Sequence, residues 1–244
     1  MRFASLVALS AAFALSASGA GAQTTAAPAI DEADPARFAD QIAAFAEEDM
    51  VALRPPCQIV FTGSSSIRRW ESLSQDLAPL PVMNRGFGGS RIVDVHHFFE
   101  QVVGRHRPAA VVFYAGENDL AAGRGPQDIV ADFEQFMALK GEALGETPVY
   151  FISLKPSKLR WEQFAAQSWI NDRIRELADR RADLEFIDVV QPMLEDGRPK
   201  EIFVEDGLHM TPEGYVLWTG AVKPVLEAHA DQLNAACQSR LAPG

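Results

Sequence analysis

The chain has 244 residues, of which 33 are Asp or Glu and 22 are Lys or Arg, so its formal net charge at pH 7 is −11. An acidic surface repels phosphate backbones and anionic lipid, which argues against nucleic-acid binding and favours a neutral or cationic substrate. The length suits one α/β domain and leaves little chain for a second.

The first 22 residues have the three parts of a cleavable export signal. Arg2 supplies the positive start, residues 6–15 an apolar core, and residues 20–22 a small-residue cleavage site before Gln23. The core is too short for a membrane anchor, since a spanning helix takes about 20 apolar residues. Residues 23–34, rich in Thr, Ala and Pro, are predicted to form a flexible leader. We therefore expect an exported protein, periplasmic or extracellular, without a membrane span, whose domain covers residues 35–244.

Apolar runs that predict strands alternate along the chain with longer amphipathic patterns that predict helices. The strands are expected at residues 58–62, 81–84, 110–114, 148–154 and 184–189. A first helix is expected to start at Asp34 and Pro35, and others near residues 67–77, 92–103, 126–144 and 159–182. Thr211 and Pro212 begin a last long helix, which should kink or break near Pro224. This alternation predicts a five-stranded parallel sheet in a three-layer α/β/α fold.

The two cysteines, Cys57 and Cys237, either pair as a disulfide or remain two buried free thiols, and composition alone does not decide between them. Cys57 opens the first strand and Cys237 lies late in the last helix, so a disulfide would be structural. His96 and His97 are adjacent on a predicted helix and point in different directions. Because no Cys or His cluster has metal-ligand spacing, we predict no metal and no cofactor.

Polar and glycine-rich stretches lie where predicted strands meet loops, which in open α/β sheets is where catalytic groups gather. Residues 63–66 follow the first strand and residues 116–119 follow the third, while residues 206–209 precede the last helix. Within the last stretch, Asp206 and His209 can form a carboxylate–imidazole pair, which activates a serine hydroxyl. Position alone leaves Ser64, Ser65 and Ser66 equal candidates for that serine.

These blocks together resemble the SGNH, or GDSL-like, hydrolase superfamily over residues 57–225. In that alignment Ser65 is the nucleophile, and Trp70 matches an aromatic residue often found five positions later. Ser64 replaces the usual aspartate, a departure that leaves the hydrogen bonding of this turn open. The Gly-Ser-Ser-Ser form of the first block, together with residues 155–157 and 160–161, further resembles an exported bacterial subgroup.

The resemblance also implies the rest of the catalytic centre. Asp206 and His209 complete a triad with Ser65, and the oxyanion hole is formed by the Ser65 amide, the Gly89 amide and the Asn118 side chain. Asp119 is expected to hold its loop. Lys155 and Arg160 are either residues of a solvated helix start or substrate contacts.

The expected activity is that of a serine esterase that cleaves carboxylic esters through an acyl-enzyme. The expected partner is a small-molecule or glycan ester. Since no long insertion could build a lid, short acyl groups are favoured, including acetyl on carbohydrate. Lysophospholipase or thioesterase activity within the same fold remains open. The alternative from another class is a non-catalytic glycan-binding protein on the same frame.

Overall fold

The computed structural model describes Met1 and residues 35–52 and 55–242. The predicted signal and leader, apart from Met1, and the helix cap at Asp34 lie outside the described residues. A parallel sheet forms the centre of the molecule, with strand order β2-β1-β3-β4-β5. The strands are β1 (Ile59–Gly63), β2 (Val82–Gly86), β3 (Ala110–Tyr114), β4 (Val149–Ile152) and β5 (Leu184–Ile187). This is the doubly wound order in which the connections leave in opposite directions from β1 and β3.

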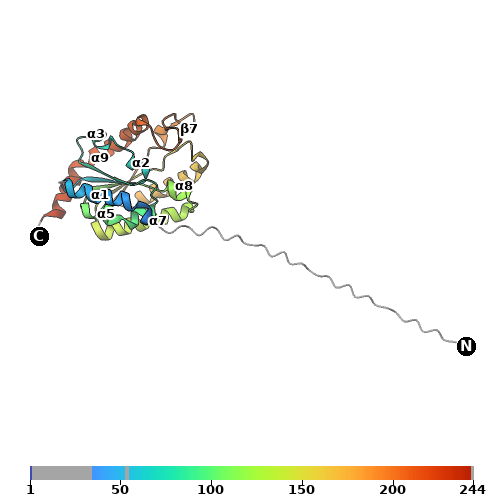
Figure 1. Ribbon diagram of the computed structural model, residues 1–244, viewed down its shortest axis with the longest axis horizontal. Coiled ribbons are helices and arrows are strands. Elements are labelled where there is room, and N and C mark those ends of the chain that lie inside the picture. The colour runs from blue at the N-terminus through green and yellow to red at the C-terminus, as the bar shows by residue number, and fades with distance from the viewer. Residues whose placement is uncertain (2–34, 53–54, 243–244) are drawn as a thin grey trace.

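Helices cover both faces of the sheet, so the fold is a three-layer α/β/α sandwich (Figure 1). One face carries α2 (Ser65–Arg68), α3 (Leu73–Asp76) and α9 (Pro212–Leu241). The other carries α4 (Ile92–His97), α5 (Phe99–Val102), α7 (Pro126–Leu144) and α8 (Phe164–Ala178), and α1 (Ala39–Val51) packs beside α5. The short elements are η1 (Pro35–Phe38), η2 (Gly104–His106), α6 (Glu117–Ala121), η3 (Trp161–Gln163), η4 (Gln191–Met193) and the hairpin of β6 (Leu194–Glu195) and β7 (Arg198–Pro199).

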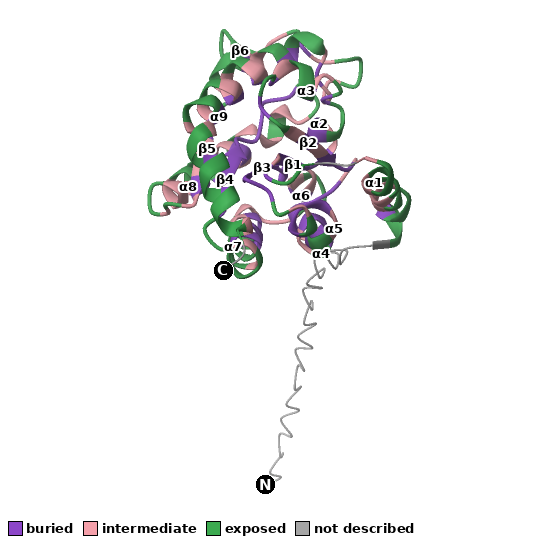
Figure 2. Ribbon diagram, turned by 90° about the vertical axis from the view of Figure 1, so that its left-hand side faces the viewer, coloured by how far each residue is buried: buried purple, intermediate pink, exposed green. Residues whose placement is uncertain are grey.

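The buried residues concentrate between the layers, on the central strands and the inner faces of the helices (Figure 2). All five residues of β1 and of β3 are buried. Such strands bury side chains on both faces, which is why their sequences are apolar without alternation. The fold prediction is therefore confirmed in its layers, its strand number and its parallel sheet.

Three predicted helices differ from the observed ones. The pattern at residues 92–103 forms two short helices, α4 and α5, on either side of Phe98. The pattern at residues 67–77 forms two short helices, because the chain turns at Trp70, whose buried ring points into the layer under α9. The last helix does not break at Pro224 but runs on from Pro212 to Leu241. Proline removes one helical hydrogen bond, and the burial of Val222 and Leu226 on either side offsets that loss.

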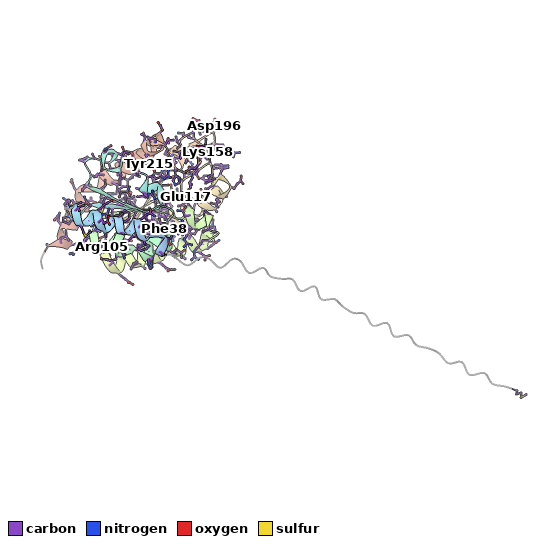
Figure 3. The ribbon with its side chains drawn as sticks, viewed as in Figure 1. Phe38, Arg105, Glu117, Lys158, Asp196 and Tyr215 are labelled. Atoms are coloured by element: carbon purple, nitrogen blue, oxygen red, sulfur yellow. A yellow bond between two sulfur atoms is a disulfide. The ribbon has the colours of Figure 1, made fainter. Side chains whose placement is uncertain are left out.

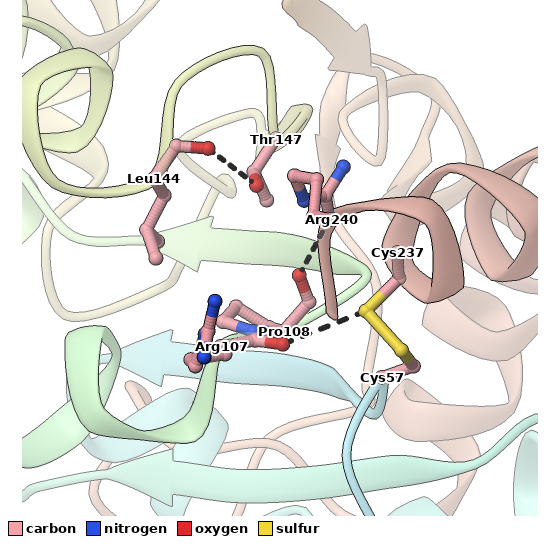
Figure 4. Close-up of a disulfide and its surroundings, with 7 residues drawn as sticks. All are labelled: Cys57, Arg107, Pro108, Leu144, Thr147, Cys237 and Arg240. Carbon is pink, nitrogen blue, oxygen red and sulfur yellow. Dashed lines mark hydrogen bonds between the residues drawn. A yellow bond between two sulfur atoms is a disulfide. The ribbon is translucent and has the colours of Figure 1, made fainter. Parts of the chain in front are cut away.

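Cys57 and Cys237 form a disulfide that joins the start of β1 to the end of α9 (Figure 4). The structure thus selects the disulfide over two free thiols. Beside it, the Arg107 carbonyl oxygen lies 3.6 Å from Cys237 Sγ, and the Pro108 carbonyl oxygen accepts a hydrogen bond from Arg240 Nη2 at 3.1 Å. The disulfide lies at the amino-terminal edge of the sheet. Ser65 and Asn118 lie at the opposite edge, after the carboxyl ends of β1 and β3.

Candidate active site

The three consecutive serines follow β1 after a tight turn at Gly63, a position where only glycine fits. Gly63 has a φ of +124°, and a Cβ added to it would lie 1.9 Å from the Tyr114 carbonyl oxygen. The Ser64 amide donates to that same oxygen at 2.8 Å. The Ser64 carbonyl then accepts the first two bonds of α2, so backbone groups hold the turn where an aspartate is usual. Ser64 and Ser66 are buried, whereas Ser65 is partly exposed.

Ser65, His209 and Asp206 form a continuous hydrogen-bonded chain. His209 Nε2 lies 2.8 Å from Ser65 Oγ, and His209 Nδ1 lies 2.6 Å from Asp206 Oδ2. With the ring proton on Nδ1, the imidazole donates to the carboxylate and accepts from the Ser65 hydroxyl. The residues come from opposite ends of the domain sequence, 144 positions apart. Of the three candidate serines, Ser65 is the one whose hydroxyl contacts the histidine.

Asp206 is held as a carboxylate by the loop it belongs to. Its Oδ1 accepts the backbone N–H groups of Leu208 and His209, each at 2.9 Å. Partial burial acts to raise the pKa of Asp206, but the bonds from the His209 side chain and from these two amides outweigh it and lower the pKa to about 2. The carboxylate is therefore ionised across the neutral and mildly acidic range, which keeps it available to orient the imidazole.

Gly89 lies on the loop after β2, between two anchors. The Phe87 amide donates to the Gly63 carbonyl at 2.9 Å, and the Ser90 carbonyl accepts the Asn118 side-chain amide at 2.9 Å. Gly89 itself has a φ of +83°. Within residues 35–52 and 55–242, neither its N–H nor that of Ser65 has a hydrogen-bond acceptor. Both donors are therefore available to a bound oxygen atom.

Asn118 is fixed at both ends of its side-chain amide. One N–H is used by the Ser90 carbonyl, and Arg160 Nη2 donates to the Asn118 Oδ1 at 2.8 Å. The second N–H of Nδ2 has no acceptor among the residues that the structure describes. The sequence predicts either a solvated residue or a substrate contact at position 160. In the structure, Arg160 contacts Asn118, the predicted oxyanion-hole residue. No local sequence signal pairs two residues 42 positions apart.

A buried polar cluster lies beneath Asn118. Lys155 Nζ donates to Glu117 Oε2 at 2.7 Å, and the Tyr114 hydroxyl donates to the same oxygen. Lys155 and Tyr114 are fully buried, and Glu117, labelled in Figure 3, is nearly so. Burial lowers the pKa of Lys155, and the ion pair with Glu117 opposes that shift. The reading of Lys155 as a solvated residue is wrong, because it is the cation that balances a carboxylate inside the fold.

Asp119 connects the segment after β3 to the loop after β2. Its Oδ1 accepts the Ile92 amide at 3.1 Å, so the carboxyl joins α6 to the first turn of α4, directly after the loop of Gly89. The side chain is fully buried, and burial raises its pKa to about 7. These contacts agree with a residue that holds its loop.

The nucleophile loop and the histidine loop are also joined through aromatic side chains. The Tyr215 hydroxyl, on the first turn of α9, donates to the Ser66 carbonyl at 2.9 Å. The Tyr215 ring stacks on Trp70, which in turn meets the edge of Trp218. Trp70 was singled out in the sequence, but its two partners were not, since they lie more than a hundred residues away.

Other features that the described residues could contain are a metal site, a membrane-spanning helix and a second cavity. Over the described ranges, no cluster of three His, Cys, Asp or Glu side chains has the geometry to hold a metal ion. In the same ranges no helix has the length and apolar character needed to cross a bilayer. A cavity of 260 Å³ lies beside the disulfide, at the edge of the sheet away from Ser65.

Several solved structures share this fold. A GDSL-like lipase from Bacteroides thetaiotaomicron aligns with a TM-score of 0.65 and 22% identity, over 81% of this chain and 99% of that one. A carbohydrate esterase of family 3 from Talaromyces cellulolyticus aligns with a TM-score of 0.59 and 18% identity, over 72% and 99% of the two chains. An acetyl esterase variant solved with an acetate ion has a TM-score of 0.57 and 16% identity, over 74% and 99%.

A search of curated proteins found no significant match to this sequence. The family comparison is decisive, because residues 56–217 match the GDSL-like lipase/acylhydrolase family and cover more than half of the chain. The match contains Ser65, Gly89, Asn118 and the Asp206–His209 pair in one ordered set. The chain therefore belongs to the GDSL-like lipase/acylhydrolase family, whose members are hydrolases.

Proposed function

We propose that the protein is a serine esterase that cleaves short-chain carboxylic esters, including acetyl groups on carbohydrate, through an acyl-enzyme. The observation that carries this proposal is the chain of hydrogen bonds from Ser65 through His209 to Asp206. A serine hydroxyl is a weak nucleophile until a neighbouring base accepts its proton, and this arrangement supplies the base and orients it.

In the proposed reaction the Ser65 oxygen attacks the ester carbonyl carbon while His209 Nε2 takes the hydroxyl proton. Negative charge then develops on the former carbonyl oxygen, which the amides of Ser65 and Gly89 and the free N–H of Asn118 would bind. His209 returns the proton to the leaving alcohol, and the C–O bond to it breaks. Water, activated by His209, then releases the acid from Ser65.

Two features favour a short acyl group. The connections between the strands are built from the helices of the fold, and no segment of residues 55–242 forms an additional lid domain. Among the solved structures of similar fold, one is a carbohydrate esterase and another an acetyl esterase. Rates on 4-nitrophenyl esters of two to sixteen carbons test this point. We expect the highest kcat/KM at two to four carbons, and a maximum at long chains would instead support a lysophospholipase.

The activated serine is tested by brief exposure to a fluorophosphonate followed by intact-mass analysis and peptide mapping. We expect one adduct, on Ser65, with no adduct in the Ser65→Ala variant and slow labelling in His209→Ala. The three proteins should have the same circular dichroism spectrum. A folded wild-type protein that takes up no label would overturn the esterase proposal and support the glycan-binding alternative.

We also propose that the protein is exported, periplasmic or extracellular, with residues 1–22 removed. The disulfide between Cys57 and Cys237 supports an oxidising compartment. The test is expression of the full chain in a bacterium, followed by N-terminal sequencing of the periplasmic and cytoplasmic fractions. A mature protein that starts at Gln23 outside the cytoplasm is expected, whereas an uncleaved chain confined to the cytoplasm would contradict the proposal.

A further inference from the structure

Three arginines near the proposed catalytic centre, Arg37, Arg68 and Arg69, have exposed or solvent-facing guanidinium groups in this acidic protein. Of the twelve other described arginines, six form ion pairs with carboxylates: Arg85, Arg91, Arg124, Arg173, Arg175 and Arg181. Across the described part of the chain, no carboxylate lies within 4 Å of the guanidinium nitrogens of the first three. The whole chain has eleven more acidic than basic residues, so carboxylates that could pair with these three arginines are abundant.

Two of these guanidinium groups lie directly on the loop that presents the Gly89 amide. A Cβ added to Gly89 would lie 2.7 Å from Arg37 Nη2, and one added to Gly88 would lie 2.6 Å from Arg68 Nη1. Gln41 on α1 holds this arrangement, because its Oε1 accepts both the Gly88 amide, at 2.7 Å, and Arg68 Nη1, at 3.2 Å. Arg37 and Arg68 are exposed, so their remaining N–H groups face solvent beside the oxyanion loop.

The third guanidinium lies on the histidine side of the centre. Arg68 and Arg69, at the end of α2, line a 610 Å³ pocket together with Met210 and Tyr215. Met210 directly follows His209, so one wall of the pocket adjoins the loop that carries the histidine. Glu71 is also in the lining, but its carboxylate is not within ion-pair distance of either arginine. The pocket therefore has two positive charges against one negative charge.

We infer that the substrate carries an oxyanion group, a carboxylate, phosphate or sulfate, next to its scissile ester, and that Arg37, Arg68 and Arg69 bind this group. The inference rests on the proposed esterase function. A guanidinium offers several N–H donors in a planar fork that matches such a group. The long-range field of the chain is negative, but salt limits it to about 8 Å at physiological ionic strength. Contact with the three arginines then decides which ester is bound, and the expectation of a neutral or cationic substrate is reversed at the site.

The test uses three acetate esters that differ in one group. These are 3-acetoxybenzoate, its neutral planar isostere 3-acetoxybenzamide, and 3-acetoxyphenyl phosphate, each followed by acetate release with spontaneous hydrolysis subtracted. We expect kcat/KM for at least one anion to exceed that for the amide by about tenfold at physiological ionic strength. The two anionic arms show whether the pocket prefers a carboxylate or a phosphate. A wild-type enzyme that hydrolyses the amide as fast as both anions would overturn the inference.

Charge-neutral variants locate the preference. Arg37→Gln, Arg68→Gln and Arg69→Gln should each lower the ratio of anion to amide kcat/KM, and the triple variant should bring it close to one. Arg180→Gln is the matched control, since this exposed arginine lies beyond α8 near the start of β5, at the opposite edge of the sheet. An anion preference that survives the triple variant would also refute the assignment. Absence of hydrolysis of every ester, with no fluorophosphonate adduct, would instead refute the esterase function itself.

Discussion

The guanidinium of Arg160 donates a hydrogen bond to the side-chain carbonyl of Asn118 across 2.8 Å. The nitrogen of the same side chain donates to the Ser90 carbonyl, so the amide plane is held at both ends. An amide that could rotate would present its oxygen instead of its nitrogen to a developing oxyanion, and the site would lose a donor when the transition state needs it.

We therefore predict that Arg160 acts as a positioning residue. Arg160→Ala should lower kcat on a neutral ester about tenfold with little change in KM, and Arg160→Lys should restore part of the loss. Asn118→Ala should cost more, on the order of a hundredfold. If Arg160 acts through Asn118, the double variant will be no slower than Asn118→Ala alone. Additive losses in the steady-state kinetics would show that Arg160 acts independently.

Asp119 should make stability depend on pH in the opposite direction from an ordinary ion-paired carboxylate. Its pKa is raised to about 7 by burial, against an ordinary value of 3.8. Between these values the folded protein keeps a proton that the unfolded chain has released, so Asp119 costs stability progressively as the pH rises from about 4 to about 7. Asn at this position keeps the acceptor for the Ile92 amide and carries no charge.

The measurement is urea unfolding of the wild-type protein and Asp119→Asn at pH 4, 5.5 and 7. Relative to wild type, the variant should gain free energy of unfolding as the pH rises, by up to about 4 kcal/mol, because one pKa unit corresponds to about 1.4 kcal/mol. A difference between the two proteins that stays constant across this range would show that Asp119 ionises at its ordinary pKa.

Tyr215→Phe removes the hydroxyl that bonds the Ser66 carbonyl and leaves the ring stacked on Trp70. We predict a loss of about 1 kcal/mol in the free energy of unfolding, with kcat reduced no more than about threefold. Tyr215→Leu also removes the stacked ring and should cost about 1 kcal/mol more. Equal stability of Phe and Leu variants in urea would show that the stacking contributes nothing.

The disulfide should contribute to stability without contributing to the chemistry. It closes a separation of 180 residues, and removal of a native disulfide typically costs about 2–5 kcal/mol. The Cys57→Ser/Cys237→Ser variant should therefore unfold at a lower temperature while its kcat at 25 °C stays within about twofold of wild type. An unchanged midpoint of thermal unfolding would contradict this expectation, and reduction of the wild-type protein by a phosphine provides an independent comparison.

The sequence predicted the parts of the structure that local patterns encode. Strands buried on both faces have continuous apolar runs, so all five were placed to within a few residues. Glycine at position 63 and the polar residues after β3 marked strand ends, because a tight turn with positive φ and a loop at a sheet edge each restrict residue type. The Asp206 and His209 pair was visible because both residues lie on one loop.

The parts that were missed depend on contacts between distant segments. The burial of Lys155 follows from Glu117, 38 positions earlier, and the orientation of Asn118 follows from Arg160. A polar side chain looks the same in sequence whether its partner is water or a buried carboxylate. Net charge similarly did not predict the local charge beside the proposed active site. A sum over the chain hides the group of arginines formed by Arg37, Arg68 and Arg69.

Strand β1 and helix α9 are connected to each other at both ends. At one end the link is the covalent bond between Cys57 and Cys237, and at the other it is the pair of contacts from His209 to Ser65 and from Tyr215 to Ser66. The two elements thus form the long sides of a closed frame, with the proposed base, His209, and the proposed nucleophile, Ser65, at one corner. A frame with cross-links at both ends keeps its shape when one of them is cut, so the catalytic corner should tolerate loss of either the disulfide or the tyrosine hydroxyl but lose its alignment when both are removed.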